Sequence, residues 1–171
     1  MLGAELRDGA SVLDLGCGDG ALAAWLLDVR GIRVSVHGLD AMEEMIDVAR
    51  ARTIDAATFD VCNLVDSDWP VVGIVDVVVL SGTLNTMEPV TARQLLQLAW
   101  TCTGVALVFN FLGDAPSASW RGRDLGPARR HSVDAMTGWA RSQCSQVDSR
   151  SDYLDGHDVT ICMRRKGDDQ P

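Results

Sequence analysis

Short apolar runs alternate with amphipathic stretches along most of the chain, and this alternation predicts strands and helices in turn. The apolar runs are rich in valine, leucine and phenylalanine, a composition typical of strands that a parallel sheet buries on both faces. We expect strands at Ser11–Leu15, Val34–Leu39, Ala56–Phe59, Asp76–Leu80 and Val105–Leu112. Segments with helical spacing of apolar residues lie between or after them, at Ala21–Val29, Ala41–Arg52, Pro89–Trp100 and Ser132–Cys144.

The C-terminal third departs from this alternation. Gly113–His131 contains two prolines and three glycines and predicts a long loop. Gln146–Tyr153 and Asp158–Arg164 predict a closing hairpin that turns at Asp155-Gly156. Taken together, the pattern predicts a single domain over residues 1–171. We expect an α/β, Rossmann-like three-layer sandwich whose mostly parallel seven-stranded sheet has one antiparallel strand near the C-terminus.

Composition narrows the class of protein further. The chain has 171 residues, and its 15 basic and 24 acidic residues give a net charge of −9. That charge repels nucleic-acid backbones, so we expect no nucleic-acid partner. The sequence offers no apolar run long enough for a membrane span and no signal-peptide core, so we expect a cytoplasmic protein with no membrane partner. Its five cysteines are scattered without a Cys-x-x-Cys pair and predict no metal site.

The segment after the first predicted strand carries the chemistry. Asp14 stands two positions ahead of a glycine-rich turn made by Gly16, Cys17, Gly18 and Gly20. Such a turn also fits a loose dinucleotide fingerprint, so by itself it leaves a nicotinamide-dependent oxidoreductase open. A carboxylate at Asp14 disfavours an approaching pyrophosphate and suits a ligand with an ammonium group.

From Val12 to about Arg165 the sequence resembles the class I S-adenosylmethionine-dependent methyltransferases, because Asp14 and the three glycines match that family's first motif. The resemblance implies that S-adenosylmethionine is the cofactor and S-adenosylhomocysteine the product. It implies that Asp40, in Gly38-Leu39-Asp40, binds the ribose hydroxyls, with a cap of the following helix as the alternative role. The remaining cofactor contacts that it implies are Cys17, Ala41, Met42, Met45, Asp60, Val61, Ser81 and Gly82. The resemblance implies that Met42 and Met45 flank the adenine, that the Asp60 side chain contacts the adenine amino group, and that Val61 makes a backbone contact.

The acceptor side of the site is less defined. No side chain there is an obvious general base, and we name Ser81 and Asn85 as the catalytic candidates. The substrate-binding candidates are Asn85, Asn110, Trp120, Arg121 and Arg123. Arginines in this loop suit a carboxylate or phosphate clamp, while the alternative is a solvated loop. The Asn/Asp-Pro-Pro-aromatic motif of base and glutamine methyltransferases is replaced by Ser81-Gly82-Thr83-Leu84.

These features predict a methyltransferase for a small-molecule acceptor, methylated at oxygen, nitrogen or carbon. A non-catalytic S-adenosylmethionine-binding protein with a regulatory or scaffolding role is the alternative. The first strand begins about ten residues after Met1, so we expect short or missing N-terminal cover helices. A homodimer, a protein partner or the Gly113–His131 loop is then expected to cover the open site.

Overall fold

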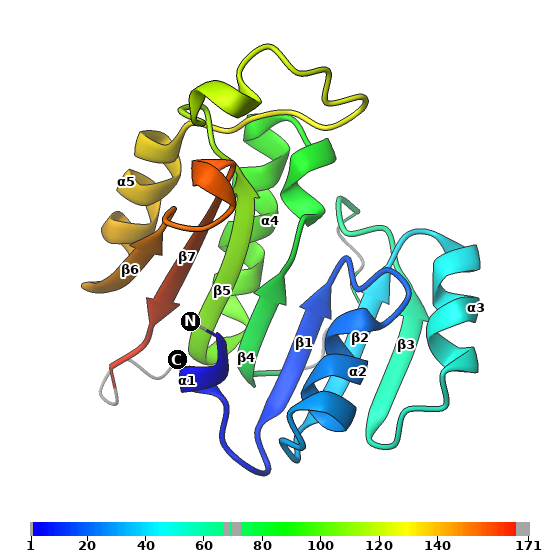
Figure 1. Cartoon of the computed structure of the whole chain (residues 1–171). Helices are drawn as coiled ribbons and strands as arrows, with labels where there is room; N and C mark the ends of the chain where they lie inside the picture. Colours follow the sequence, from blue (N-terminus) through cyan, green and yellow to red (C-terminus); the bar gives the residue numbers. More distant parts are fainter. Residues whose placement is uncertain (1, 67–68, 70–72, 167–171) are drawn as a thin grey trace.

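Seven strands form one sheet in the computed structural model, which describes residues 2–66, 69 and 73–166 (Figure 1). The strand order is β3-β2-β1-β4-β5-β7-β6. Strands β1 to β5 pair in parallel, whereas β7 runs antiparallel to both β5 and β6, which confirms the predicted sheet. The strands are β1 Ser11–Leu15, β2 Ser35–Asp40, β3 Ala57–Val61, β4 Val75–Leu80, β5 Thr103–Leu112, β6 Gln146–Arg150 and β7 Asp158–Arg164.

Helices cover both faces of this sheet. The α-helices are α1 Leu2–Glu5, α2 Ala21–Ala24, α3 Glu43–Ala51, α4 Pro89–Thr101 and α5 Val133–Gln143. Helix α2 continues as the π-helical turn η1 Trp25–Val29, and single 3-10 turns form η2 Thr83–Thr86, η3 Ala118–Trp120 and η4 Leu154–Gly156. In the described part of the chain, no helix has the length and apolar composition needed to cross a membrane.

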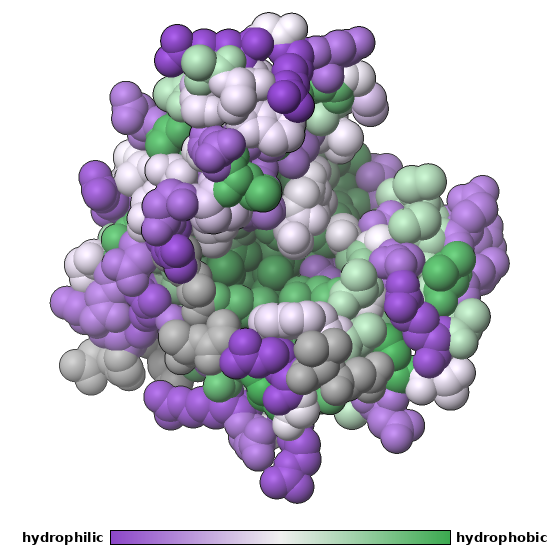
Figure 2. Space-filling view, viewed as in Figure 1, coloured by the Kyte–Doolittle hydropathy of each residue, from purple (hydrophilic) through white to green (hydrophobic). Residues whose placement is uncertain are grey.

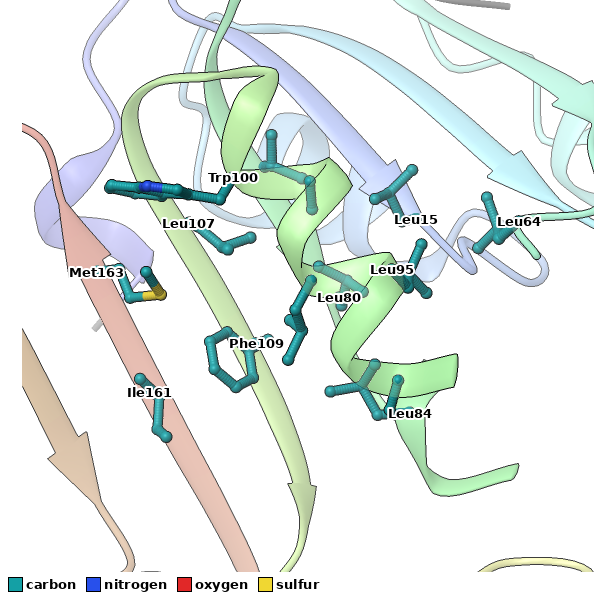
Figure 3. Close-up of a cluster of buried hydrophobic side chains, with 14 of the residues drawn as sticks. Leu15, Leu64, Leu80, Leu84, Leu95, Trp100, Leu107, Phe109, Ile161 and Met163 are labelled. Atoms are coloured by element: carbon teal, nitrogen blue, oxygen red, sulfur yellow. The ribbon is translucent and has the colours of Figure 1, made fainter. Parts of the chain in front are cut away.

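The two faces of the sheet have separate cores because side chains alternate along each strand. Helices α4 and α5 pack on one face, where Leu15, Leu80, Phe109 and Ile161 belong to the same buried cluster as Leu95 (Figure 3). Helices α2 and α3 pack on the other face against the first four strands. On that second face Leu2 of α1 packs against the small cluster from β5 and β7. The residues that the structure describes therefore cover this end of the second face thinly.

The predicted boundaries differ from the observed ones by a few residues. Helix α3 begins at Glu43 because Asp40 and Met42 belong to the turn that leaves β2. Strand β3 extends to Val61, and β6 ends at Arg150, before the turn η4. The 113–131 loop contains the short turn η3, and Gly113 and His131 bridge its two ends. These contacts tie the loop closely to the carboxyl edge of the sheet.

Candidate active site

The glycine turn between β1 and α2 is shaped by its neighbours. Gly16, Gly18 and Gly20 all have positive φ angles, of 78°, 53° and 77°. A Cβ atom at Gly16 would lie 2.3 Å from Thr83 Oγ1, whose hydroxyl donates to the Leu15 carbonyl. At Gly18 such an atom would meet only Met45 Cε, at 3.5 Å. Gly16 is therefore required for packing and for backbone conformation, while Gly18 keeps one side of the turn open.

Asp40 connects this turn to the end of β2. Its Oδ2 accepts a hydrogen bond from the Gly18 N–H, and its Oδ1 accepts one from the Met42 N–H, each at 2.9 Å. The second bond forms a local turn ahead of α3, so Asp40 is not the residue that directly precedes the helix. A carboxylate oxygen can accept more than one hydrogen bond. Both oxygens therefore retain capacity for ribose hydroxyls.

Asp14 is buried beside the glycine turn, with 2% of its surface exposed. Its Oδ1 has no hydrogen-bond partner among the described residues. Burial, and secondarily the nearby charge of Asp40, raise the pKa of Asp14 to about 7. A buried carboxyl group without a partner fits a cationic ligand group, because an ammonium would supply both the hydrogen bond and the opposite charge. The site thus fits the methionine end of S-adenosylmethionine.

The remaining predicted cofactor contacts after β2 and on β3 differ in exposure and in the partners that they already have. Met42 is 57% exposed and Val61 is 48% exposed, and Ala41 is exposed too, so these three are open to a ligand. The Asp60 carboxylate already contacts His37 Nε2 at 2.9 Å and Arg50 at 3.1 Å. These partners give Asp60 a structural role at the edge strand β3. Its contact with the adenine amino group stays a prediction.

The end of β4 leads into a second turn, where the catalytic candidates lie. Gly82 has a φ of 77°, and its N–H donates to Asn110 Oδ1 at 2.6 Å. Asn85 Oδ1 accepts from the Leu112 N–H at 2.9 Å, which joins η2 to the end of β5. Ser81 is exposed beside this turn. Asn85 therefore has a structural bond at its acceptor oxygen, and the catalytic roles of Ser81 and Asn85 stay predictions.

The arginine-rich loop is stacked against the C-terminal hairpin. Trp120 stacks on His157 with 3.8 Å between ring centroids, and the Arg123 guanidinium lies 4.3 Å from the Trp120 ring. Arg130 donates to the Gly113 carbonyl and lies 3.2 Å from His157 Nδ1. Arg121 is exposed, with its Nε bonded to the Pro116 carbonyl. Contacts between Arg121, Arg123 or Trp120 and an acceptor stay predictions.

A hollow of about 370 Å³ lies on the thinly covered face, beside the end of β4. Figure 2 shows its apolar floor at the centre of the molecule. It is lined by Leu2, Leu22, Val79, Leu80, Ser81, Val108, Phe109, Asn110, Arg150, Tyr153 and Thr160. Sequence reasoning found Ser81 and Asn110 but missed Arg150, Tyr153 and Thr160. The register of β7 against β5 sets Thr160 opposite Asn110, and the pairing of β6 with β7 sets Arg150 opposite Thr160. Tyr153 follows in the connection between β6 and β7.

Comparisons with known proteins agree with this geometry. Residues 12–103 match the family model described as a methyltransferase domain. A trans-aconitate 2-methyltransferase of Mycolicibacterium gilvum is 37% identical over 81 residues, which are 47% of this chain and 29% of that relative. The chain therefore spans less than a third of that curated relative.

Solved structures extend the likeness to nearly the whole chain. Magnesium protoporphyrin IX methyltransferase from Synechocystis, with bound S-adenosylhomocysteine, is 17% identical at a TM-score of 0.71; the match covers 93% of this chain and 75% of that one. An S-adenosylmethionine-dependent methyltransferase from Mesorhizobium loti is 19% identical at a TM-score of 0.73, over 96% and 95% of the two chains. Fold and glycine turn define the class of Rossmann-like, S-adenosylmethionine-dependent methyltransferases. The chain belongs to the methyltransferase domain family.

Proposed function

We propose that this protein transfers the methyl group of S-adenosylmethionine to a small-molecule acceptor. One observation carries the proposal: the buried Asp14 carboxyl, without a partner at Oδ1, lies beside a glycine turn that Asp40 holds through Gly18. A nicotinamide dinucleotide would bring phosphate charge toward this carboxyl. An ammonium group is the complementary ligand.

Each part of the site then has a role in binding. Asp14 binds the ammonium group, the turn at Gly16–Gly20 packs against the methionine part, and Asp40 accepts hydrogen bonds from the ribose. Met42 and Met45 offer apolar surface for the adenine, and Val61 offers a backbone contact. The cofactor supplies a methyl group that is activated by its sulfonium charge. The hollow beside Ser81 takes the acceptor, and its apolar floor excludes water from the reacting groups.

The relatives support a small acceptor. The Mycolicibacterium relative is named for trans-aconitate, and the Synechocystis structure for magnesium protoporphyrin IX. The volume of the hollow, about 370 Å³, lies at the small end of ordinary ligand pockets. The homodimer or protein partner expected from the sequence stays a prediction, as does the cytoplasmic location.

Calorimetry tests the proposal with S-adenosylmethionine, S-adenosylhomocysteine and NADH as separate ligands. We expect both sulfur compounds to bind and NADH not to bind. Asp40→Asn should weaken the binding of both sulfur compounds by roughly 10- to 100-fold, because it removes the negative charge and replaces one acceptor oxygen with an NH2 donor. Asp47→Asn is the matched control, since Asp47 is an exposed carboxylate of α3. Binding of NADH alone, or an unchanged dissociation constant in Asp40→Asn, would contradict the proposed site.

Methyl transfer itself distinguishes an enzyme from a binding protein. Formation of S-adenosylhomocysteine is measured with a panel of phenols, amines and carboxylic acids. We expect turnover with at least one class of acceptor. Tight binding of both sulfur compounds with no turnover on any acceptor would favour the non-catalytic alternative.

A further inference from the structure

The described residues that line the hollow are uncharged except for one arginine. Among the described residues that line it, Arg150 is the only charged one. Arg150 uses Nε and one terminal nitrogen to bind Asp152, at 2.9 and 3.1 Å, which leaves its other terminal nitrogen for a ligand. An anionic ligand gains from this guanidinium, whereas a protonated amine meets no opposite charge on the described lining.

Two hydroxyl groups form the polar part of the wall. Tyr153 Oη and Thr160 Oγ1 are hydrogen-bonded to each other. A bond between two hydroxyls uses one of their two hydrogens, so the pair has a second hydrogen to donate. Burial raises the pKa of Tyr153, so this phenol keeps its proton at neutral pH. The pair therefore acts as a hydrogen-bond donor to an electron-rich oxygen and not as a base.

The described lining also contains no aspartate, glutamate, histidine or lysine. An acceptor that must lose a proton during the reaction finds no general base there. An acceptor that is anionic at neutral pH needs none. Its oxygen contributes the electron pair of the new C–O bond, while the electron pair of the breaking C–S bond stays on sulfur. The sulfonium becomes a neutral thioether, and the acceptor becomes a neutral ester or ether.

We propose, building on the function proposed above, that the hollow binds an apolar organic acid, whose anionic oxygen is methylated. Tyr153 and Thr160 donate a hydrogen bond to the acid, Arg150 binds its charge, and the apolar floor at Val79 and Val108 holds its hydrocarbon part. This assigns acceptor selectivity to the C-terminal hairpin, outside the loop with Arg121 and Arg123.

The test uses the protein saturated with S-adenosylhomocysteine and follows amide signals by nuclear magnetic resonance. The probes are benzoate, cinnamate and hexanoate, each compared with its primary amide and its corresponding primary amine. We expect at least one acid to bind saturably, to shift the amide signals of Ser81, Asn110, Tyr153 and Thr160, and to bind about tenfold or more tightly than its amide or amine.

Two variants test the assigned residues. Tyr153→Phe and Arg150→Gln should each weaken acid binding by about tenfold and amide binding clearly less, because hydrogen bonds to a charged acceptor are the stronger ones; general unfolding would not produce this selective effect. Arg141→Gln, at an exposed arginine of α5, is the matched control. Circular dichroism and the dissociation constant of S-adenosylhomocysteine show whether each variant is folded.

The outcomes separate the two proposals. If S-adenosylhomocysteine does not bind, the proposed function fails, and this inference fails with it. If S-adenosylhomocysteine binds but no acid binds more tightly than its amide and its amine, the inference alone is overturned. The same holds if the shifted amide signals belong to residues away from the hollow. Equal losses for acids and amides in Tyr153→Phe would likewise reject the selective role of that hydroxyl.

Discussion

Asp14 combines a structural cost with the binding role that we propose for it. Its carboxyl group is buried and lies near Asp40, and its pKa is raised from the ordinary value of 3.8 to about 7. Keeping this group charged is unfavourable in the ligand-free chain, because burial removes its solvation. A cationic ligand reverses the preference. We therefore expect the same carboxyl to link proton binding to cofactor binding.

We predict opposite pH dependences for folding and for cofactor binding. The folded, ligand-free chain holds a proton on Asp14 that the unfolded chain releases between pH 3.8 and about 7. The contribution of Asp14 to the free energy of unfolding therefore rises as the pH falls from 8 to 5. The affinity for S-adenosylmethionine should instead fall by up to about tenfold per pH unit below 7, since the ammonium group requires the charged carboxylate.

Calorimetry at pH 6 and 8, together with denaturant unfolding at the same pH values, measures both effects. Asp14→Asn is the control, because its amide does not titrate and both pH dependences should shrink in that variant. An affinity that is constant from pH 6 to 8 in the unmodified protein would show that Asp14 does not bind the cofactor as a carboxylate.

At the scale of elements, the turn between β1 and α2 depends on contacts from outside the motif. Gly16 packs under Thr83 of η2, and Gly20 lies against Phe59 of β3 and Ala49 of α3. The positions of Gly16 and Gly20 in the sequence are therefore required partly by packing against residues outside the motif. At Gly18 glycine is required by the positive φ angle of the backbone. An added Cβ there would make an ordinary contact with Met45, so space remains beside this position.

Gly16→Ala should lower the free energy of unfolding more than the same substitution at a glycine that has a similar φ angle and free space beside it. Gly31 is such a control, since its φ is 62° and no heavy atom lies within 4 Å of an added Cβ. A left-handed conformation costs alanine about 1–2 kcal/mol at either position. The contact with Thr83 should add roughly 1–3 kcal/mol at Gly16. Denaturant unfolding measures the difference, and equal losses at both positions would contradict this packing role.

At the scale of the whole molecule, the loop at 113–131 and the C-terminal hairpin stabilise each other. The stack of Arg123, Trp120 and His157 joins segments that are far apart in the sequence, and Arg130 adds a contact to His157. Ser117 N–H also donates to the Asp155 carbonyl, at 3.3 Å. Tyr153 lies just ahead of η4, so the loop supports one wall of the hollow.

Trp120→Ala should loosen this connection without unfolding the domain. We expect amide hydrogen exchange in residues 113–131 and 151–157 to become about tenfold faster, because the variant removes an aromatic stack and a cation–π contact. Trp25→Ala is the matched control, since Trp25 is 38% exposed and lies 5.3 Å from the Arg30 guanidinium. Unchanged exchange at the hairpin would show that the stack does not hold it.

The sequence was sufficient to predict the sheet and to place Asp14, the glycine turn and Asp40 close together. The buried strand β4 is apolar at every position except Asp76, so its composition alone marks it as a strand. Asp14, the glycine turn and Asp40 follow their strands directly in the chain. In a parallel sheet the carboxyl ends of neighbouring strands meet at one edge, so local sequence fixes where these residues lie.

Only the tertiary structure decided which side chains surround the hollow and how Asp60 is used. Arg150 and Thr160 reach the hollow through the antiparallel pairing of β7 with β5 and β6, and a shift of one residue in register would turn them to the opposite face. Tyr153 reaches it from the connection between β6 and β7. Asp60 is bound by His37 and Arg50, which come from two other elements. Local patterns determine strands, turns and the residues at their ends, whereas contacts across elements depend on register and packing that no short segment encodes.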